Sequence, residues 1–228
     1  MTKKEETLLR RQQKETAERE RVAGMRRFER EAVAAKYPAL RAALICGIDE
    51  AGRGPLAGPV AAGACILPLD YDIPGLNDSK KLSEKKRGQL YEVILRESIA
   101  WNVALVSPER IDEINILQAT YEAMREAVAG LSVRAQVLVN DAVTIPGLDL
   151  PQVPVIRGDA QCLSVAAASI LAKVTRDRLM QEADRLYPEY GFAQHKGYGT
   201  KAHIEAIRTY GPCPIHRRTF ITHFISEN

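Results

Sequence analysis

The segment from residue 44 to residue 67 reads LICGIDEAGRGPLAGPVAAGACIL. Two apolar runs, 44–49 and 60–67, flank a turn rich in glycine and proline, which predicts two strands paired as an antiparallel hairpin. The first run ends in Asp49 and Glu50, so two carboxylates stand at a strand end beside bare backbone. Neighbouring side chains in a strand face opposite ways, so both can reach one site only if the chain turns there, as the glycines permit. Taken alone, the pair fits an acidic turn after a strand equally well.

Outside this hairpin, short apolar runs alternate with helical patterns, which is typical of an α/β domain. Glycine after residue 129 suits a helix end, and Thr200 suits a helix start. We expect further strands at residues 98–106, 135–139 and 153–156, and helices at residues 111–129, 161–186 and from Thr200 to just before Gly211. The sequence therefore predicts an α/β fold with about five strands and no internal repeat.

Residues 1–40 have a different character, because Lys, Arg and Glu dominate and no glycine precedes Gly24. Pairs such as Glu6 with Arg10 have the spacing that supports an exposed helix, and the apolar stripe is patchy. We interpret residues 1–40 as a solvent-exposed, charged helical extension. Residues 41–228 then form one domain whose C-terminal part is helical.

The bulk composition excludes several classes of protein. With 46% hydrophobic and 27% charged residues and no long apolar run, the chain has no predicted membrane span. Its start lacks a secretion signal, so we expect a cytoplasmic protein. The four dispersed cysteines, which we expect to be reduced and buried, are Cys46, Cys65, Cys162 and Cys213. A net charge of +3 permits a polyanionic partner without requiring one.

Two more acids follow predicted strands. Asp141 comes after the apolar run 137–139, and Asp159 lies between the strand near residue 155 and the long helix. Strand ends along one edge of an α/β sheet come together in the fold. Clustered carboxylates without His or Cys favour hard cations such as Mg²⁺ or Mn²⁺. Any single one of these acids could still be a structural loop residue.

The stretch GIDEAGRGPLAGPV, residues 47–60, resembles the signature of the type 2 ribonucleases H. Further matches are DSKKL at 78–82, SVAAASILAKVTRD at 164–177, HKGYGT at 195–200, GP at 211–212 and HR at 216–217. The likeness runs from about Leu44 to Phe220, and only the N-terminal helix lies outside it. It implies a ribonuclease H-like mixed sheet flanked by helices.

The resemblance implies four metal-binding catalytic carboxylates, at Asp49, Glu50, Asp141 and Asp159, holding two Mg²⁺ or Mn²⁺ ions. The third position is unusual, because the family reads apolar-apolar-Asp there and this chain has Asn140 before the acid. Residues after Asp141 favour that register, but an Asn140 register remains open. Asp177 is a competing fourth acid, although its position inside a helix near Lys173 and Arg176 indicates structural ion pairs.

The resemblance also implies the substrate and its contacts. The enzyme would hydrolyse the RNA strand of RNA-DNA hybrids and cut 5′ of single ribonucleotides embedded in duplex DNA, leaving 5′-phosphate and 3′-hydroxyl ends. Gly52, Arg53 and Gly54 would read the ribose 2′-hydroxyl, and Tyr198 would stack on a sugar beside the cut. The expected phosphate contacts are Lys80, Lys81 and Lys196. We expect a monomer, no metal role for the four histidines, and little loss of cleavage on deletion of residues 1–38.

Two other functions remain in view. A type 3 ribonuclease H would share the carboxylates, but it has a folded N-terminal domain where this chain has only some 40 helix-like residues. A non-catalytic nucleic-acid-binding module would not need four carboxylates, because acids repel phosphate unless a metal bridges them. A metal-dependent cleavage assay separates an enzyme from a binding module.

Overall fold

The computed structural model describes residues 2–40, 44–70 and 73–225. Its five strands are β1 Ile45–Ala51, β2 Val60–Ile66, β3 Ala100–Val106, β4 Val137–Asp141 and β5 Gln152–Val155. The α-helices are α1 Lys3–Lys36, α2 Glu84–Glu97, α3 Pro108–Ala129, α4 Gly158–Gln161, α5 Leu163–Leu186, α6 Phe192–His195, α7 Lys201–Tyr210 and α8 Arg218–Ile221. Short 3-10 turns lie at η1 Pro38–Leu40, η2 Ser79–Lys81 and η3 Pro188–Tyr190.

The strands form one mixed sheet in the order β3-β2-β1-β4-β5. β1 pairs antiparallel with β2, as the hairpin pattern predicts, and β2 pairs antiparallel with β3. β1 and β4, and β4 and β5, pair in parallel. The prediction of a mixed sheet of about five strands flanked by helices, with a helical N-terminal extension, is confirmed.

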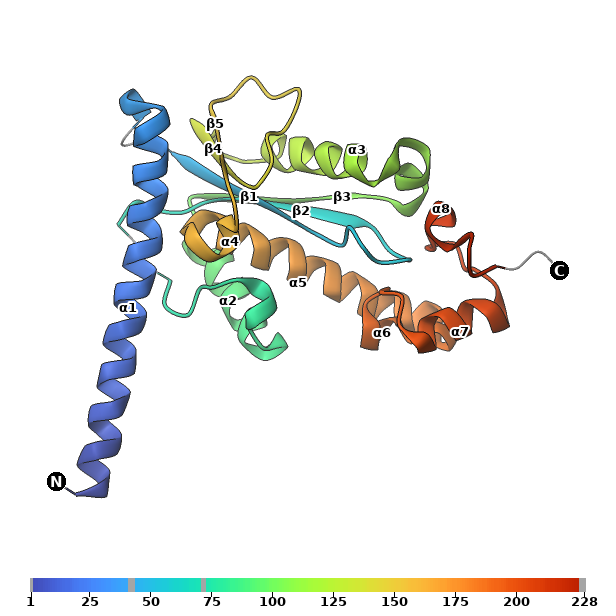
Figure 1. Ribbon diagram of the computed structural model, residues 1–228, viewed down its shortest axis with the longest axis horizontal. Helices are drawn as coiled ribbons and strands as arrows, with labels where there is room; N and C mark the ends of the chain where they lie inside the picture. Colours follow the sequence, from blue (N-terminus) through green and yellow to red (C-terminus); the bar gives the residue numbers. More distant parts are fainter. Residues whose placement is uncertain (1, 41–43, 71–72, 226–228) are drawn as a thin grey trace.

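Helices cover both faces of the sheet (Figure 1), with α3 on one face and α5 and α2 on the other. The packing of α5 is unusually close, because a Cβ at Gly47 would lie 2.0 Å from the backbone of Ser164 and one at Gly63 would lie 2.3 Å from the carbonyl oxygen of Ala168. No side chain fits at either position, so the two glycines let the helix backbone rest on β1 and β2. This contact fixes where α5 stands relative to the end of β1.

The long helix α1 runs along one side of the molecule (Figure 1), and its buried residues lie in its second half. Val22 and Met25 join the core between α2 and α5, and Val33 joins the core beside β4 and β5. Glu29 is buried, and its Oε2 accepts a hydrogen bond of 2.9 Å from the N–H of Ser164 in the first turn of α5. The interpretation of this helix as wholly solvent-exposed is therefore wrong for residues 22–33.

The remaining expectations hold with small shifts at the ends of elements. The third strand begins at Ala100 because Ser98 caps the C-terminus of α2, a helix that the pattern reading missed. Helix α7 starts after an N-cap on Thr200, as expected, but α8 follows it near the C-terminus. The four cysteines are buried and free. Within the described residues, no helix has both the length and the apolar character that crossing a membrane requires.

Candidate active site

The register of the parallel strands places two of the predicted acids on one face of the sheet. Gly47 faces α5, so Asp49, two residues further along β1, faces α5 as well. Ile48 pairs with Asn140, which makes Asn140 a residue of the opposite face and sends Asp141 toward the face of Asp49. Asn140 is fully buried there, and its Nδ2 donates to Gln152 Oε1 at 2.8 Å and to the Val143 carbonyl at 3.2 Å.

Asp49 is buried against α5. Ser169 forms a side-chain hydrogen bond with Asp49, and the Ser169 Oγ lies 2.9 Å from the Oγ of Ser79. The Oδ1 of Asp49 also accepts the N–H of Glu50 at 2.8 Å. Burial first, and then the charge of Glu50, raise the pKa of Asp49 well above its ordinary value, and Asp141 adds to the effect. An ionised Asp49 is therefore costly here until a cation offsets the charge.

Asp159, in the first turn of α4, is the next member of this acidic cluster. Burial, followed by the charges of Asp78 and Asp141, raises the pKa of Asp159, and a side-chain hydrogen bond joins it to Asp78. The side chain of Lys80 lies close to these carboxylates. Burial alone would lower the pKa of Lys80, but the surrounding carboxylates raise it. Asp78 also caps η2 through a bond of 2.9 Å from the Lys80 N–H, so one short turn brings both residues to the acids.

A pocket of about 310 Å³ opens beside these carboxylates. Its walls are Asp49, Glu50, the turn 51–54, Ser79, Lys80, Ser169, Lys173 and Tyr198. The Glu50 carboxylate points toward Arg53, with Oε1 at 3.3 Å from Nη1. The structure thus gathers most of the predicted site around one cavity. Asp141 and Asp159 stand next to it through their interactions with Asp49 and Lys80.

The glycine turn after β1 rests on a buried arginine of α5. Gly52 has a φ of +91°, and a Cβ there would lie 2.1 Å from Nε of Arg176. Both the backbone conformation and the close contact therefore require glycine. The Arg176 guanidinium donates to the carbonyls of Pro59 at 2.9 Å, Ala57 at 3.0 Å and Lys196 at 2.9 Å. One side chain thus ties the base of the turn to the loop that carries Tyr198.

Tyr198 is 45% exposed and lines the pocket. Its carbonyl lies 2.9 Å from Nδ1 of His203, whose Nε2 lies 3.0 Å from Nε2 of His216. Burial lowers the pKa of both imidazoles to about 4, so both are neutral at pH 7. The Cys213 N–H donates to Nδ1 of His216, so the proton of this neutral ring is on Nε2. His216 Nε2 then donates to Nε2 of His203, and Nδ1 of His203 donates to the carbonyl of Tyr198. These histidines have a structural role beneath the tyrosine.

Besides Asp141 and Asp159, three other candidate residues, Lys81, Asp177 and Lys196, lie outside the pocket lining. Lys81 is exposed on η2, and the ammonium of Lys196 bonds to the carbonyl of Ala193. Asp177 forms ion pairs with Lys173 at 2.7 Å and with Arg87 at 3.9 Å. The expectation that Asp177 makes structural ion pairs is confirmed, with Arg87 in place of Arg176 as the second cation.

The donor set suits a hard divalent cation, because it consists of carboxylates held together against their own repulsion. Within residues 2–40, 44–70 and 73–225, no three acidic, His or Cys side chains converge closely enough to hold an ion as they stand. Glu50 is engaged by Arg53, and Asp159 by Asp78.

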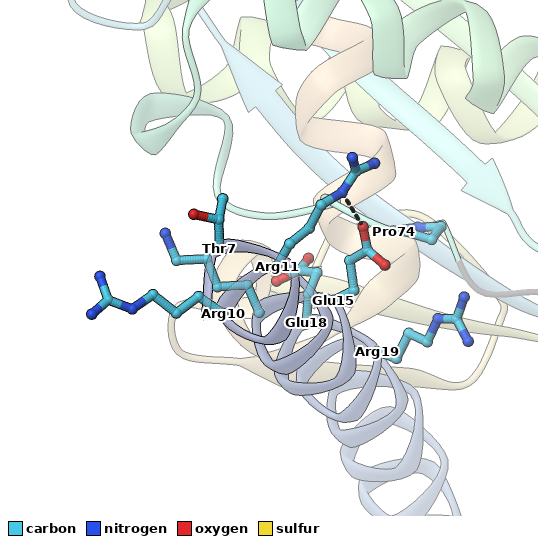
Figure 2. A pocket seen from close by; sticks show the side chains of 8 residues that line it. Thr7, Arg10, Arg11, Glu15, Glu18, Arg19 and Pro74 are labelled. Carbon is cyan, nitrogen blue, oxygen red and sulfur yellow. Dashed lines mark hydrogen bonds and ion pairs between the residues drawn. The ribbon is translucent and has the colours of Figure 1, made fainter. Parts of the chain in front are cut away.

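A larger hollow, of about 900 Å³, lies along the first half of α1 beside Pro74 (Figure 2). Its charged side chains include Arg11 and Glu15, which form an exposed pair at 3.0 Å. Such a pair contributes about 0–1 kcal/mol, and the hollow has no acidic cluster or glycine turn. The smaller pocket at the strand ends is therefore the candidate active site.

Several residues of the site escaped the sequence analysis. Asp78 and Ser79 belong to the DSKKL stretch, in which the sequence indicates a role for the lysines alone. Ser169 lies on the face of α5 that the helical pattern assigned to packing, and Arg176 and Arg217 are charged residues that a pattern reading places at the surface. Only their place in family-like motifs could have identified them.

Comparisons with known proteins give one consistent result. The family model described as Ribonuclease HII matches residues 46–223. A ribonuclease HII of Lachnoclostridium phytofermentans is 56% identical over 216 residues, which cover 95% of this chain and 82% of that protein. The solved ribonuclease H2 of Pyrococcus horikoshii is 28% identical with a TM-score of 0.66, covering 80% of this chain and 99% of that one. A ribonuclease HIII solved in complex with Mn²⁺, at 16% identity and a TM-score of 0.52, shares the fold alone. The chain belongs to the ribonuclease HII family.

Proposed function

We propose that this protein is an endonuclease that hydrolyses the RNA strand of RNA-DNA hybrids and cuts 5′ of single ribonucleotides embedded in duplex DNA. The observation that carries the proposal is the pocket itself. Asp49 and Glu50 at the end of β1 form one wall, with Asp141 at the end of β4 beside them, and the backbone of the glycine turn 52–54 forms another. One wall suits a metal-assisted attack on phosphate, and the other suits close approach of a ribose.

The proposed metal ligands are Asp49, Glu50, Asp141 and Asp159. Two Mg²⁺ or Mn²⁺ ions bound there would supply an activated water and stabilise the leaving oxygen, which gives 5′-phosphate and 3′-hydroxyl ends. Before binding, the raised pKa of Asp49 reflects carboxylates crowded in a buried place. Ser169 keeps the Asp49 side chain oriented by its hydrogen bond, and the packing of α5 on Gly47 keeps Ser169 in place.

The other residues of the pocket position the nucleic acid. Lys80 stands among the carboxylates, which supports a contact with the phosphate, and Lys81 and Lys196 would be more distant phosphate contacts. Gly52, Arg53 and Gly54 present backbone groups to the ribose 2′-hydroxyl, which distinguishes RNA from DNA. The half-exposed ring of Tyr198 stacks on a sugar beside the cut. We infer that the substrate is a duplex, with one strand lying across the pocket.

The test is cleavage mapping on a DNA duplex that contains one ribonucleotide, with Mg²⁺ and Mn²⁺ compared and an all-DNA duplex as the control. A cut on the 5′ side of the ribonucleotide that requires the metal and is lost in Asp49→Asn is the expected result. Binding of both duplexes without any cleavage would favour a non-catalytic module and overturn the proposal.

A further inference from the structure

Arg217, just before α8, is a fully buried cation whose hydrogen bonds all go to backbone carbonyls of the turn after β1. Its Nη2 donates to Gly52 at 2.5 Å, its Nη1 to Arg53 at 2.8 Å and its Nε to Gly58 at 3.0 Å. The Asp112 carboxylate attracts it, but that carboxylate bonds to the N–H groups of the two residues that follow Arg217. The guanidinium therefore acts as a clamp on the turn.

The clamp determines which way two peptide groups point. In a planar trans peptide, the C=O of one residue and the N–H of the next point in opposite directions, and no described peptide bond is cis. The carbonyls of Gly52 and Arg53 point inward at Arg217, so the N–H groups of Arg53 and Gly54 point away from it. Both residues line the pocket, and in the described chain neither N–H donates to a protein atom. Two parallel backbone donors are thus left for a ligand.

We propose that Arg217 is a positioning residue for sugar discrimination, which holds the N–H groups of Arg53 and Gly54 ready to donate to the ribose 2′-oxygen. The proposal rests on the proposed function and names the residue that makes its sugar contact rigid. A 2′-deoxyribose offers no oxygen at this point, so it leaves both donors unpaired as the duplex covers them. Unpaired buried donors are costly, and rigid ones cannot turn away to water.

The guanidinium fork is needed for this geometry. Three donors in one plane reach three carbonyls at fixed angles, whereas a lysine ammonium is a point charge on a flexible stem and cannot hold all three. Arg217→Lys keeps a hydrogen-bond donor on a long side chain in the cavity while it releases at least one carbonyl. That variant tests the geometry of the fork without leaving the cavity empty.

Arg176 provides a matched control. It is equally buried, and its guanidinium likewise donates to three carbonyls, but these belong to Ala57, Pro59 and Lys196. Arg176→Lys should therefore lower the melting temperature much as Arg217→Lys does, without releasing the carbonyls of Gly52 and Arg53. A general loosening of the fold would affect both variants equally.

The experiment measures binding with Ca²⁺ in place of Mg²⁺, using a DNA duplex with one ribonucleotide and the same duplex made only of DNA. The readout is the ratio of the two dissociation constants. We expect Arg217→Lys to lower the preference for the ribonucleotide about tenfold, because two neutral hydrogen bonds to the ribose 2′-oxygen are misaligned. Arg176→Lys, which also loosens the loop that carries Tyr198, should weaken the binding of both duplexes alike and keep the ratio within about twofold of the unmodified protein.

A second readout is the amide spectrum of ¹⁵N-labelled protein. The resonances of Arg53 and Gly54 should shift on binding the ribonucleotide duplex in the unmodified protein and in Arg176→Lys, and much less in Arg217→Lys. An unchanged ratio in a folded Arg217→Lys variant, or equal loss in both variants, overturns the inference. If the unmodified protein cuts the ribonucleotide duplex but binds both duplexes equally, the inference fails while the proposed function stands. If it neither cuts nor discriminates, the proposed function fails and the inference falls with it.

Discussion

Exchanging the side chains of Asn140 and Asp141 one at a time should give opposite results for stability and activity. The two residues are neighbours in β4 but face opposite sides of the sheet. Asn140 is buried on the α3 side, where its amide donates two hydrogen bonds. Asp141 is on the side of Asp49, where its Oδ1 accepts the Gly158 N–H at 2.7 Å.

In Asn140→Asp, the donor that reaches Gln152 Oε1 and the Val143 carbonyl is replaced by a carboxylate oxygen. Both contacts then bring two acceptors together, and the new charge is buried without a counter-ion. The cost is about 3–5 kcal/mol, as for breaking a buried pair. For a chain of this size we expect the melting temperature to fall by roughly 6–20 °C.

In Asp141→Asn, the acceptor for the Gly158 N–H is retained, and one charge is removed from beside Asp49. Stability should therefore equal or exceed that of the unmodified protein, because carboxylate repulsion is relieved. Turnover should fall at least about 100-fold, since even residues that only support a metal ligand cost 10–100-fold when changed.

The assay combines thermal melting with single-turnover cleavage of a duplex that contains one ribonucleotide. We expect a stable but inactive Asp141→Asn and a destabilised Asn140→Asp, and the double variant should not recover activity. Full activity in Asp141→Asn, or recovery in the double variant, would refute the assignment of the third carboxylate to position 141.

Further predictions concern the supporting structure. Deletion of residues 1–16 should leave cleavage and melting temperature unchanged. Deletion of residues 1–38, for which the sequence alone predicts little effect, should lower both, because it removes Glu29. Equal behaviour of the two deletions would contradict this expectation. Burial raises the pKa of Glu29 from its ordinary 4.5 to about 7, so its contribution to the free energy of unfolding is complete below about pH 4.5 and is lost as the pH rises through 7. Glu29→Gln should flatten the pH dependence of urea unfolding between pH 5 and 7, and an unaltered slope would show that another group titrates. Tyr198→Ala should slow single-turnover cleavage of an embedded ribonucleotide more than it weakens duplex binding, with metal binding unchanged; an unmodified rate would make the tyrosine structural. Asp177→Asn should lower the free energy of unfolding by about 3 kcal/mol in chemical denaturation while the metal requirement persists, because it breaks a buried ion pair.

Much of the fold can be predicted from patterns within short stretches of the sequence. The alternation of short apolar runs with helical stretches predicts the five strands and α5, and the glycine turn predicts the β1-β2 hairpin. The acids at three strand ends could be found because a strand ends where its apolar run ends. These features depend on residues close together in the sequence.

Non-local features could not be read in this way. The choice between Asn140 and Asp141 depends on the register of β4 against β1, which lies some ninety residues away in the chain. The packing of α1 depends on a few apolar residues that make only a broken stripe, and on Glu29, a charged residue that composition assigns to solvent. Arg217 gives no local signal for the same reason, because its partners are carbonyls that only the folded turn brings together.

The contacts that hold the residues of the candidate active site in place converge on α5. Gly47 and Gly63 let this helix rest on the sheet, so that Ser169 reaches Asp49 and, through Ser79, holds the turn that carries Lys80. Helix α1 reaches both parts of this arrangement: Glu29 caps the start of α5, and Glu18 accepts the Gly75 N–H in the loop that leads to Lys80. Helix α1, which lies outside the family-like motifs, is thus joined to two elements that position the acids and Lys80. A change in the packed half of α1 should therefore reach catalysis through the placement of Asp49 and Lys80, even though no residue of α1 lines the pocket.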